Sequence, residues 1–227
     1  MKKIFFAVSI LKKMGNEIRG YQLETCFGTG GCPNRAADSD GLFERMKDIL
    51  NKADILAFLK KRVKSDLRHH HEFRTALSDC PNACSQPQIK DMGIIGAMEP
   101  VVTDEPCSLC QACAEACIEK AIIVGDTERF PLIDHERCMK CGKCITACPN
   151  GTLSVGRRGY RVLLGGKLGR HPRLAEELQG IYTEDQVVEI LGECIGTYKE
   201  NSRQGERFSE LFHEPQIHDR FIMKISP

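Results

Sequence analysis

Two stretches of the chain share one cysteine spacing, CSLCQACAEAC at residues 107–117 and CMKCGKCITACP at residues 138–149. Each contains the pattern C-x2-C-x2-C-x3-C, and together they hold eight of the 13 cysteines. Three thiolates spaced in this way can bind successive corners of one iron–sulfur cube, and the fourth usually reaches a second cube. Structural zinc sites also use C-x2-C pairs, but they take them from two separated arms. The compact groups therefore favour two [4Fe–4S] clusters over zinc.

Four further cysteines form two pairs that precede these groups. Cys26 and Cys32 enclose a glycine-rich C-x5-C segment, and Cys80 and Cys84 belong to the segment CPNAC. Glycines allow the backbone to approach a bound group closely. The two pairs supply four thiolates, which is the number that one [4Fe–4S] cluster takes. Cys194 stands alone.

The two compact groups resemble a bacterial two-cluster ferredoxin of the 2[4Fe–4S] type. One departure is Ile118, which follows Cys117 where such a ferredoxin has proline. It removes no ligand. The resemblance implies a crossover in which the fourth cysteine of each group binds the other cluster. One cluster would then be held by Cys107, Cys110, Cys113 and Cys148, and the other by Cys138, Cys141, Cys144 and Cys117.

The outer pairs have a different resemblance. C-x5-C followed at a distance by C-P-N-x-C is similar to the siroheme and iron–sulfur domain of the sulfite and nitrite reductase family. The resemblance implies that Cys26, Cys32, Cys80 and Cys84 hold a third [4Fe–4S] cluster. It also implies that Cys84 bridges to the iron of siroheme, which would couple an electron store directly to the catalytic iron.

The segment GGKLGRHPR at residues 165–173 resembles a stretch of the same family that lies against the macrocycle. Siroheme carries eight carboxylates and needs many cations around it. We therefore expect Lys167, Arg170 and Arg173 to supply charge, and Gly165 and Gly166 to let backbone amides approach. The alternative is a basic turn on the surface.

The family reduces sulfite to sulfide or nitrite to ammonia, so the resemblance implies a small oxyanion as substrate. Such a substrate needs cations and proton donors near the haem iron. The candidates are Arg35, Arg74 and Lys90, with Arg68 as a fourth. Each could instead pair with a siroheme carboxylate or be a solvated charge. Residues 69–71 are three histidines, which we interpret as a solvated loop or helix end rather than as acids.

Composition excludes several other classes of protein. The 227 residues are 41% hydrophobic and 28% charged, which is unlike a disordered chain. Lys and Arg number 32 against 31 for Asp and Glu, so charge gives no reason to expect nucleic-acid binding. The apolar run Ile4–Leu11 is shorter than the roughly 20 residues of a membrane span. We expect a buried strand there, no membrane association and a cytoplasmic protein whose cysteines are reduced.

The pattern of elements predicts an α+β fold. The two resemblances imply a siroheme and 4Fe-4S domain interrupted by a two-cluster ferredoxin-type insert. The expected divisions are 1–98, 99–155 for the insert, and 156–227. Helices are expected over 42–63, from Thr183 with Gln186 completing a capping box, and over 206–212. Cys194 falls on the core face of the second helix. Strands are expected at 4–11, 72–77, 89–95 and 160–164.

The resulting hypothesis is a siroheme-dependent reductase of sulfite or a related oxyanion, with electrons entering through the ferredoxin-type clusters from a donor protein. Typical family members are larger and contain a paired repeat. A second subunit or a second copy of the chain is therefore expected to complete the site. Two alternatives remain, an iron–sulfur electron-transfer subunit without its own substrate site and a non-catalytic carrier of siroheme or clusters.

Overall fold

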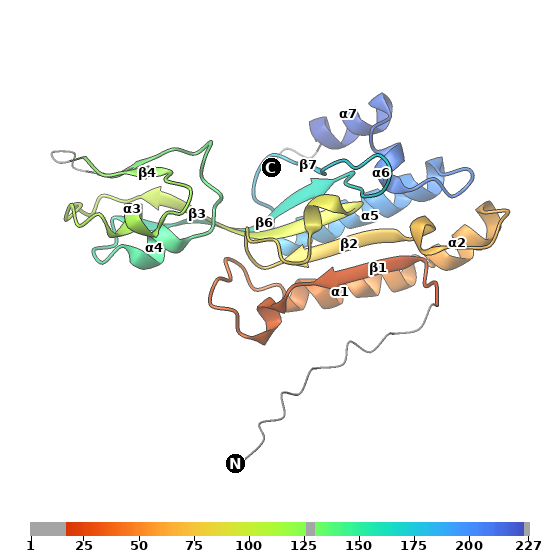
Figure 1. Ribbon diagram of the computed structural model, residues 1–227, viewed down its shortest axis with the longest axis horizontal. Coiled ribbons are helices and arrows are strands. Elements are labelled where there is room, and N and C mark those ends of the chain that lie inside the picture. Colours follow the sequence, from red (N-terminus) through yellow and green to blue (C-terminus); the bar gives the residue numbers. More distant parts are fainter. Residues whose placement is uncertain (1–16, 126–129, 225–227) are drawn as a thin grey trace, which may run out of the picture.

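The computed structural model describes residues 17–125 and 130–224, and its centre is a five-stranded mixed sheet (Figure 1). The sheet has the order β1-β2-β3-β6-β7. Its strands are β1 (Tyr21–Thr25), β2 (Phe73–Ser78), β3 (Met92–Val102), β6 (Leu153–Leu164) and β7 (Glu176–Glu177). β1, β2 and β3 run parallel, whereas β6 is antiparallel to both of its neighbours. The expected α+β class is confirmed.

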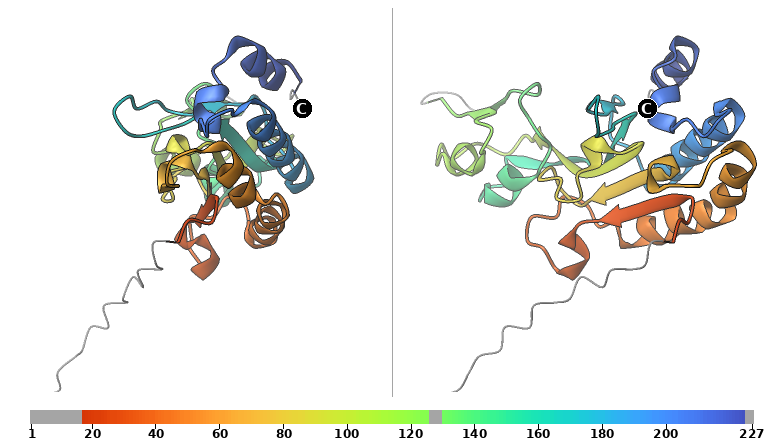
Figure 2. Two further views of the ribbon diagram at one scale, coloured as in Figure 1. Left: turned by 90° about the vertical axis from the view of Figure 1, so that its right-hand side faces the viewer. Right: turned by 45° about the vertical axis from the view of Figure 1, so that its right-hand side comes forward.

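Helices α1 (Asp40–Lys52) and α5 (Glu184–Asn201) pack against one face of this sheet (Figures 1 and 2). The strands present alternate apolar residues to them, such as Phe73 and Leu77 of β2. Leu42 and Leu191 are fully buried from the helix side. α6 (Phe208–Leu211) and α7 (Pro215–Lys224) close the same core. Among the described helices, none is long and apolar enough to cross a bilayer.

The single helix expected over 42–63 is wrong, because the structure contains two helices there. α1 ends at Lys52 and α2 spans Ile55–Arg62. Asp54 separates them with a φ of 45°, and its carboxylate caps α2 by accepting a hydrogen bond from Ala57 N at 3.3 Å. Aspartate competes with helical hydrogen bonding in this way, so the apolar period continues across a break in the helix.

The helix expected from Thr183, α5, is confirmed at its start and on its buried face. Thr183 Oγ1 accepts a hydrogen bond from Gln186 N at 3.3 Å, and Gln186 Oε1 accepts one from Thr183 N at 2.8 Å. This capping box begins α5 where the sequence predicts it. Cys194 is fully buried, and burial raises the pKa of its thiol well above the ordinary value. It is a core residue.

Several strand predictions need correction. β3 and β6 are longer than expected because they continue past the main sheet as a two-stranded arm, with a register shift between Glu99 and Pro100. β1 and α7 have no counterpart among the expected elements. The expected strand at 4–11 lies outside the described residues. The expected boundaries at 99 and 155 fall within β3 and β6, and the division into domains remains a prediction.

The arm leads to a smaller unit at one end of the molecule (Figure 1). The unit contains α3 (Ala112–Ala116), α4 (Lys143–Ala147), β4 (Ile122–Ile123) and β5 (Leu132–Ile133). It has its own core, in which buried Ile122 and Leu153 pack with Cys113 and Cys144. α3 and α4 have the same offset in sequence as the two cysteine groups. The spacing repeat is therefore also a repeat of backbone structure.

Candidate metal centres

The outer pairs of cysteines meet because they follow neighbouring parallel strands. Cys26 comes directly after β1, and Asp79 and Cys80 come directly after β2. The strands end in register, with Thr25 opposite Leu77, and Cys26 N donates a hydrogen bond to Leu77 O at 3.1 Å. Carboxyl ends of parallel strands meet at one edge of a sheet, which is a common place for ligands. Loops separated by about fifty residues of sequence are thereby joined.

All four thiols of these loops are neighbours. Burial raises the pKa of the Cys80 thiol, and the thiols of Cys32, Cys26 and Cys84 raise it further. We call this set of four cysteines the outer site. Cys84 is the exposed member, whereas the other three are half-buried. A thiolate at this position can be reached from solvent as well as from the space between the four cysteines.

Polar donors surround the sulfur atoms of the outer site. Cys26 Sγ accepts hydrogen bonds from Gly28 N at 3.3 Å and from Asp79 N at 3.4 Å. Cys84 Sγ accepts one from Asn82 Nδ2 at 3.0 Å. Such donors stabilise negative charge on sulfur and tune the potential of a cluster.

Asp79 connects the two loops of the outer site. Its carboxylate is buried and accepts from Ser39 Oγ, and Arg35 Nε lies 2.8 Å from its Oδ2. Its carbonyl oxygen accepts from Ala36 N at 2.8 Å. A Cβ at Gly28 would lie 1.9 Å from the Asp79 carboxylate, which explains one glycine of the C-x5-C segment. Sequence reasoning missed Asp79, although its position just before Cys80 was a signal.

The first compact group forms a second set of neighbours with the last cysteine of the other group. Burial raises the pKa of Cys113, and Cys148 and Cys107 raise it further. Cys148 also acts on Cys110, whose pKa is nevertheless lowered because its sulfur accepts from Ala112 N and Ser108 Oγ. We call the set Cys107, Cys110, Cys113 and Cys148 the far site.

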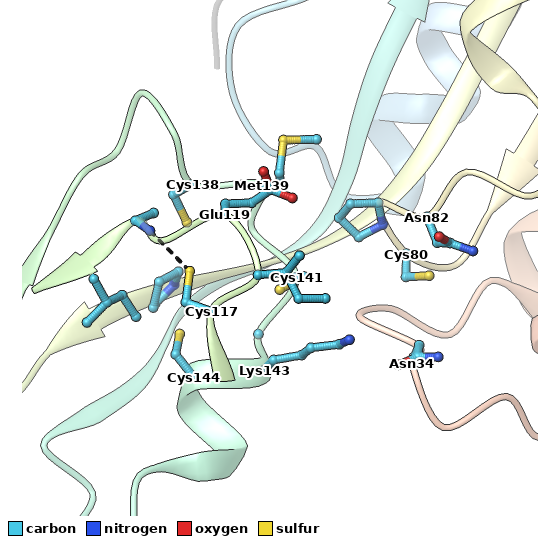
Figure 3. Close-up of a pocket in the computed structure, with 16 residues that line it drawn as sticks. Asn34, Cys80, Asn82, Cys117, Glu119, Cys138, Met139, Cys141, Lys143 and Cys144 are labelled. Carbon is cyan, nitrogen blue, oxygen red and sulfur yellow. Dashed lines mark hydrogen bonds between the residues drawn. The ribbon is translucent and has the colours of Figure 1, made fainter. Parts of the chain in front are cut away.

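The remaining four cysteines form the near site, Cys117, Cys138, Cys141 and Cys144. Burial raises the pKa of Cys144 to about 12, with further increases from Cys138, Cys141 and Cys117. The four thiols line one cavity of about 320 Å³ (Figure 3). Cys117 Sγ accepts a hydrogen bond from Ala121 N at 3.3 Å (Figure 3). Both crossover sets expected from the sequence are therefore groups of spatial neighbours.

The same cavity reaches the outer site. Its lining includes Cys80 and Asn82 of the CPNAC loop and Asn34 of the loop that follows Cys32. The near site is held against the main sheet because Met98 of β3 donates a backbone hydrogen bond to Lys140 O at 2.7 Å. The far site is tied to the end of the arm, where Thr103 N bonds Thr152 O at 2.8 Å.

The segment at 165–173 lies beside the CPNAC loop. Ala83, Leu163 and Ala175 pack together, and Ala175 N donates to Gln88 O at 2.7 Å. The segment is a hairpin in which Lys167 and Arg173 exchange backbone hydrogen bonds of 2.9 and 3.0 Å. Cβ atoms at Gly165 and Gly166 would collide with Phe212 and with Gln88 O, so packing requires both glycines.

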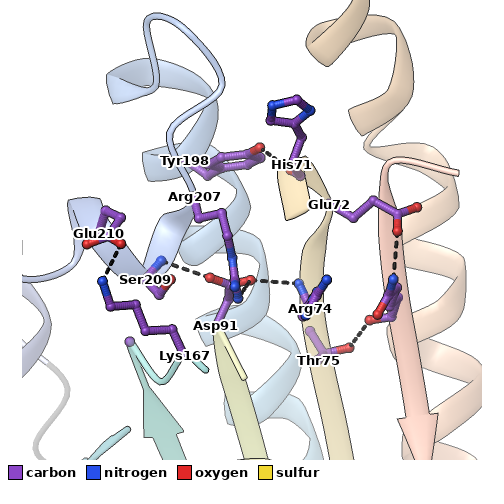
Figure 4. A network of polar contacts seen from close by, with 12 residues as sticks. His71, Glu72, Arg74, Thr75, Asp91, Lys167, Tyr198, Arg207, Ser209 and Glu210 are labelled. Atoms are coloured by element: carbon purple, nitrogen blue, oxygen red, sulfur yellow. Dashed lines mark hydrogen bonds and ion pairs between the residues drawn. The ribbon is translucent and has the colours of Figure 1, made fainter. Parts of the chain in front are cut away.

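The expected cations of this segment are already partly paired. Lys167 Nζ lies 2.5 Å from Glu210 Oε1 (Figure 4). Arg173 donates to Ser209 O and lies 3.8 Å from Glu210 Oε2, but its buried Nε has no partner among the described residues. Arg170 is exposed at the hairpin tip and forms no ion pair with any described residue. Arg170 is therefore the exposed cation of this segment without an ion-pair partner among the described residues.

The candidate substrate cations also have protein partners. Arg35 lies 2.6 Å from Asp38 in addition to its contact with Asp79. Lys90 is buried and lies 2.7 Å from Glu24. Arg74 donates to His69 O at 3.1 Å, while its buried Nε has no partner in the described part. The structure brings Arg35 beside the outer site. A contact of Arg35, Arg74 or Lys90 with substrate stays a prediction.

Arg74 also belongs to a buried network around Asp91 (Figure 4). The Asp91 carboxylate accepts from Arg74 N and Ser209 N, each at 2.8 Å, and from Arg207 at 2.9 Å. These bonds attach α6 to the sheet. The histidine triplet forms a 3₁₀ turn, His69–His71, in which His69 and His70 are exposed. The interpretation of a solvated turn is confirmed.

Comparison with known proteins identifies the family. Residues 15–218 match the family described as the nitrite and sulphite reductase 4Fe-4S domain. The chain belongs to this family. It is 35% identical over 187 residues to a coenzyme F420-dependent sulfite reductase of Methanocaldococcus jannaschii, covering 80% of this chain and 27% of that protein.

Two further relatives extend the comparison. Over 105 residues the chain is 26% identical to one subunit of the anaerobic sulfite reductase of Salmonella typhimurium, covering 46% of this chain and 26% of that one. The chain spans only about a quarter of either curated relative. The crystal structure of dissimilatory sulfite reductase I shares the fold, with a TM-score of 0.54 at 16% identity, over 85% of this chain and 49% of that one.

The 4Fe-4S domain of this family requires residues that fit a cluster, and the outer site has them. It offers four thiols and three hydrogen-bond donors to sulfur within one pair of loops. Among the described residues, no three His, Cys, Asp or Glu side chains are close enough to hold one metal ion. A cluster does not need such convergence, because each cysteine binds a different iron. For siroheme the fit is partial, since Lys167 is held by Glu210.

Proposed function

We propose that the chain carries three [4Fe–4S] clusters and siroheme, and that it reduces sulfite or a related small oxyanion such as nitrite. The outer site would hold the cluster of the family's 4Fe-4S domain, with Cys84 shared with siroheme. The near and far sites would hold the two clusters of a ferredoxin-type unit over 99–155. Segments 1–98 and 156–227 would together form the siroheme domain.

One observation carries this proposal. Two loops that follow adjacent parallel strands place four cysteines together, although the pairs are far apart in sequence. Four half-buried or exposed thiols gathered at a strand edge add little to the hydrophobic core, whereas four thiolates with donors to their sulfurs suit a cluster. The match to the family's 4Fe-4S domain supports the same assignment.

Clusters and siroheme would supply the electrons and the catalytic iron, and the residues of the chain would hold and orient them. Gly28 N, Asp79 N and Asn82 Nδ2 donate to the outer-site sulfurs. Exposure of Cys84 leaves its sulfur accessible to a second iron. Arg170 is exposed and would be available for a macrocycle carboxylate, and the partly exposed Arg173 lies in the same hairpin. Arg35, Arg74 and Lys90 remain candidates for the substrate anion.

The lengths and names of the relatives support the expectation that this chain works with a partner protein. The Salmonella relative is by its name one component of a multi-chain anaerobic sulfite reductase, and both curated relatives are much longer than the matched part. We expect a second subunit or a second copy to complete the substrate site. We also expect an electron-donor protein, and a cytoplasmic location for the chain.

A second candidate is an electron-transfer subunit without its own substrate site. The observation in its favour is that the expected cations already have carboxylate partners, as in the pairs Lys167–Glu210, Lys90–Glu24 and Arg35–Asp79. Binding an anionic macrocycle or substrate would have to compete with these pairs. Under this proposal the outer site keeps its cluster, and only siroheme is missing.

The deciding experiment is anaerobic purification from a host that makes siroheme, followed by iron analysis and absorption spectroscopy. The full proposal requires about 13 irons per chain and siroheme bands above the iron–sulfur shoulder. About 12 irons without haem bands would support the electron-transfer subunit. About eight would overturn the outer cluster. Sulfide release from sulfite with reduced viologen then separates a reductase from a carrier.

A further inference from the structure

The near and far sites repeat one backbone but differ in charge. Leu109 of the first cysteine group corresponds to Lys140 of the second, and Ala112 corresponds to Lys143. The first group therefore contains no cation between its first and last cysteines, whereas the second contains two. Glu115 lies in the first group, where the second has Thr146. This difference is visible in the sequence, but its consequence depends on where the side chains lie.

The backbone places corresponding residues equivalently. Leu109 and Lys140 both have left-handed φ values, 58° and 57°. The next turn is also matched, since Gln111 and Gly142 have φ values of 61° and 75° and precede α3 and α4. Non-glycine residues adopt this conformation only under constraint. Each lysine consequently has the same relation to its cysteines as the neutral residue of the other group.

Lys143 has a second distinguishing feature, its position in the cavity. Together with the four near-site cysteines it lines the space that also contains Cys80 of the outer site. Figure 3 shows its side chain extending from α4 toward Asn34, on the side of Cys80. It forms no ion pair with any described residue. Glu119 lines the same cavity, and Glu99 lies near Lys140 but is already paired with Arg157 at 2.8 Å.

We propose that Lys140 and Lys143 make the cluster of the near site easier to reduce than the cluster of the far site, and that the near-site cluster is the direct neighbour of the outer one. This rests on the proposed function, because it assumes clusters at all three sites. Reduction adds one negative charge to a cluster, and a nearby cation stabilises the added charge. No bond forms or breaks, and the electron comes from an external one-electron donor.

The arrangement of the sites gives the potential difference a direction. The far site, at the end of the arm, has no cation within its cysteine group, and the near site lies between it and the outer site. An electron that enters at the far site thus moves toward the more positive surroundings of the near site and then faces Cys80. Lys140 and Lys143 act here only through their charge, which changes the reduction potential of the near-site cluster, and they do not contact substrate.

The test is an exchange of charges between matched positions in the full chain. In the variant Lys140→Leu/Lys143→Ala, the second group takes the residues of the first. Leu109→Lys/Ala112→Lys is its mirror image, and Lys60→Ala on α2 is a control away from the cysteine groups. Each protein is loaded with iron under anaerobic conditions, and its clusters are titrated with a reductant while electron paramagnetic resonance spectra are recorded.

The expected result is specific to one signal. Removing the lysines should lower the higher of the two ferredoxin-type reduction potentials by ~59 mV. For one electron this corresponds to about a tenfold smaller ratio of reduced to oxidised cluster at the same solution potential. The mirror variant should raise the lower potential, and the control should change neither. High salt should narrow the wild-type difference, because both lysines are at least partly exposed.

Contrary outcomes can be told apart. If the iron content is normal but the lysine variant shifts neither potential, or shifts the lower one, the inference is overturned while the proposed function stands. If only about eight irons bind, the outer cluster is absent, and the claim of a direct neighbour fails with it. If the near and far cysteines bind no iron, both the proposed ferredoxin-type unit and the inference fail.

Discussion

The small unit that contains α3 and α4 and the outer site bring cysteines together by different means. All eight cysteines of the unit lie between residues 107 and 148, and a small local core of Ile122, Val124 and Leu153 holds them. The outer site draws its four from two loops whose positions depend on β1 and β2 being adjacent. Spacing alone therefore largely determines the first kind of site, whereas the second exists only when the large sheet and its helices are folded.

This difference implies that substitutions in the two hydrophobic cores should disturb different cysteine sites. Damage to the main core should reach the outer site through the strand ends, and should reach the near and far sites only through the arm of β3 and β6. Damage to the small core should have the opposite pattern. Substitutions that affect one region and spare the other test the comparison.

The largest expected effect is that of Cys84→Ser. We expect loss of the outer cluster, about four irons, together with the haem bands, because this thiolate would serve both groups. Cys113→Ser is the matched change in the unit and should disturb the far-site cluster while the haem bands remain. Iron analysis and absorption spectra measure both results. An unchanged haem spectrum in Cys84→Ser would mean that the bridging assignment is wrong.

Core substitutions come next. Leu191→Ala removes a fully buried side chain of α5, and we expect it to cost about 2–5 kcal/mol of unfolding free energy. In urea, the outer-site signal should disappear before those of the near and far sites. Ile122→Ala, in the small core, should reverse the order. Simultaneous loss of all cluster signals in both variants would show that the two regions unfold as one unit.

The same contrast explains how much could be predicted from the sequence. The ferredoxin resemblance implied both crossover sets, whose members are neighbours in the structure because they lie in one small unit, and their ligation stays a prediction. The Thr183 capping box predicted the start of α5. The break at Asp54 was missed because the apolar period continues across it. β1 was missed because its five residues, YQLET, are a weak strand signal on their own. Its pairing with β2 gives it order.

The contacts around the outer site could not be predicted from the sequence. Arg35 was chosen as a candidate substrate cation because it follows Cys32 closely, and that role stays a prediction. Its actual neighbours are Asp38 and Asp79, and Asp79 is supplied by a loop distant in sequence. Long-range pairs of this kind have no local pattern. The cations of residues 165–173 are a similar case, since Glu210, which pairs with Lys167, comes from α6.

Asp79→Ala should give a smaller effect that is confined to the outer site. The change leaves Ser39 and Arg35 without their buried acceptor, at a cost of about 1–3 kcal/mol. We expect weaker retention of the outer cluster during gel filtration and no change at the near and far sites. Asp38→Ala is the control, because Asp38 contacts the same arginine but its side chain is 72% exposed. Equal losses in the two variants would contradict the special role of Asp79.

The smallest expected effect concerns His218 in α7, which lies on the large core. Its Nε2 is 2.8 Å from Glu176 Oε2, and this hydrogen bond raises the pKa of His218. Because the folded pKa is higher than the unfolded value, the stabilisation is complete below about pH 6.5 and is lost as the pH rises through the folded pKa. The pair is partly exposed, so we expect the charge-dependent cost of His218→Asn to be less than about 1 kcal/mol at pH 6 and absent at pH 9, where only the lost ring contact with Phe212 remains. Urea unfolding at the two pH values measures this difference. Burial and the charges of Arg173 and His218 lower the pKa of neighbouring His213, so its effect on stability has the opposite sign, and His218→Asn removes only the part that comes from His218. The near and far sites should be indifferent to the substitution at either pH, since α7 packs only on the core of the main sheet. A response of their cluster signals would therefore show that the two regions are more tightly coupled than their separate cores imply.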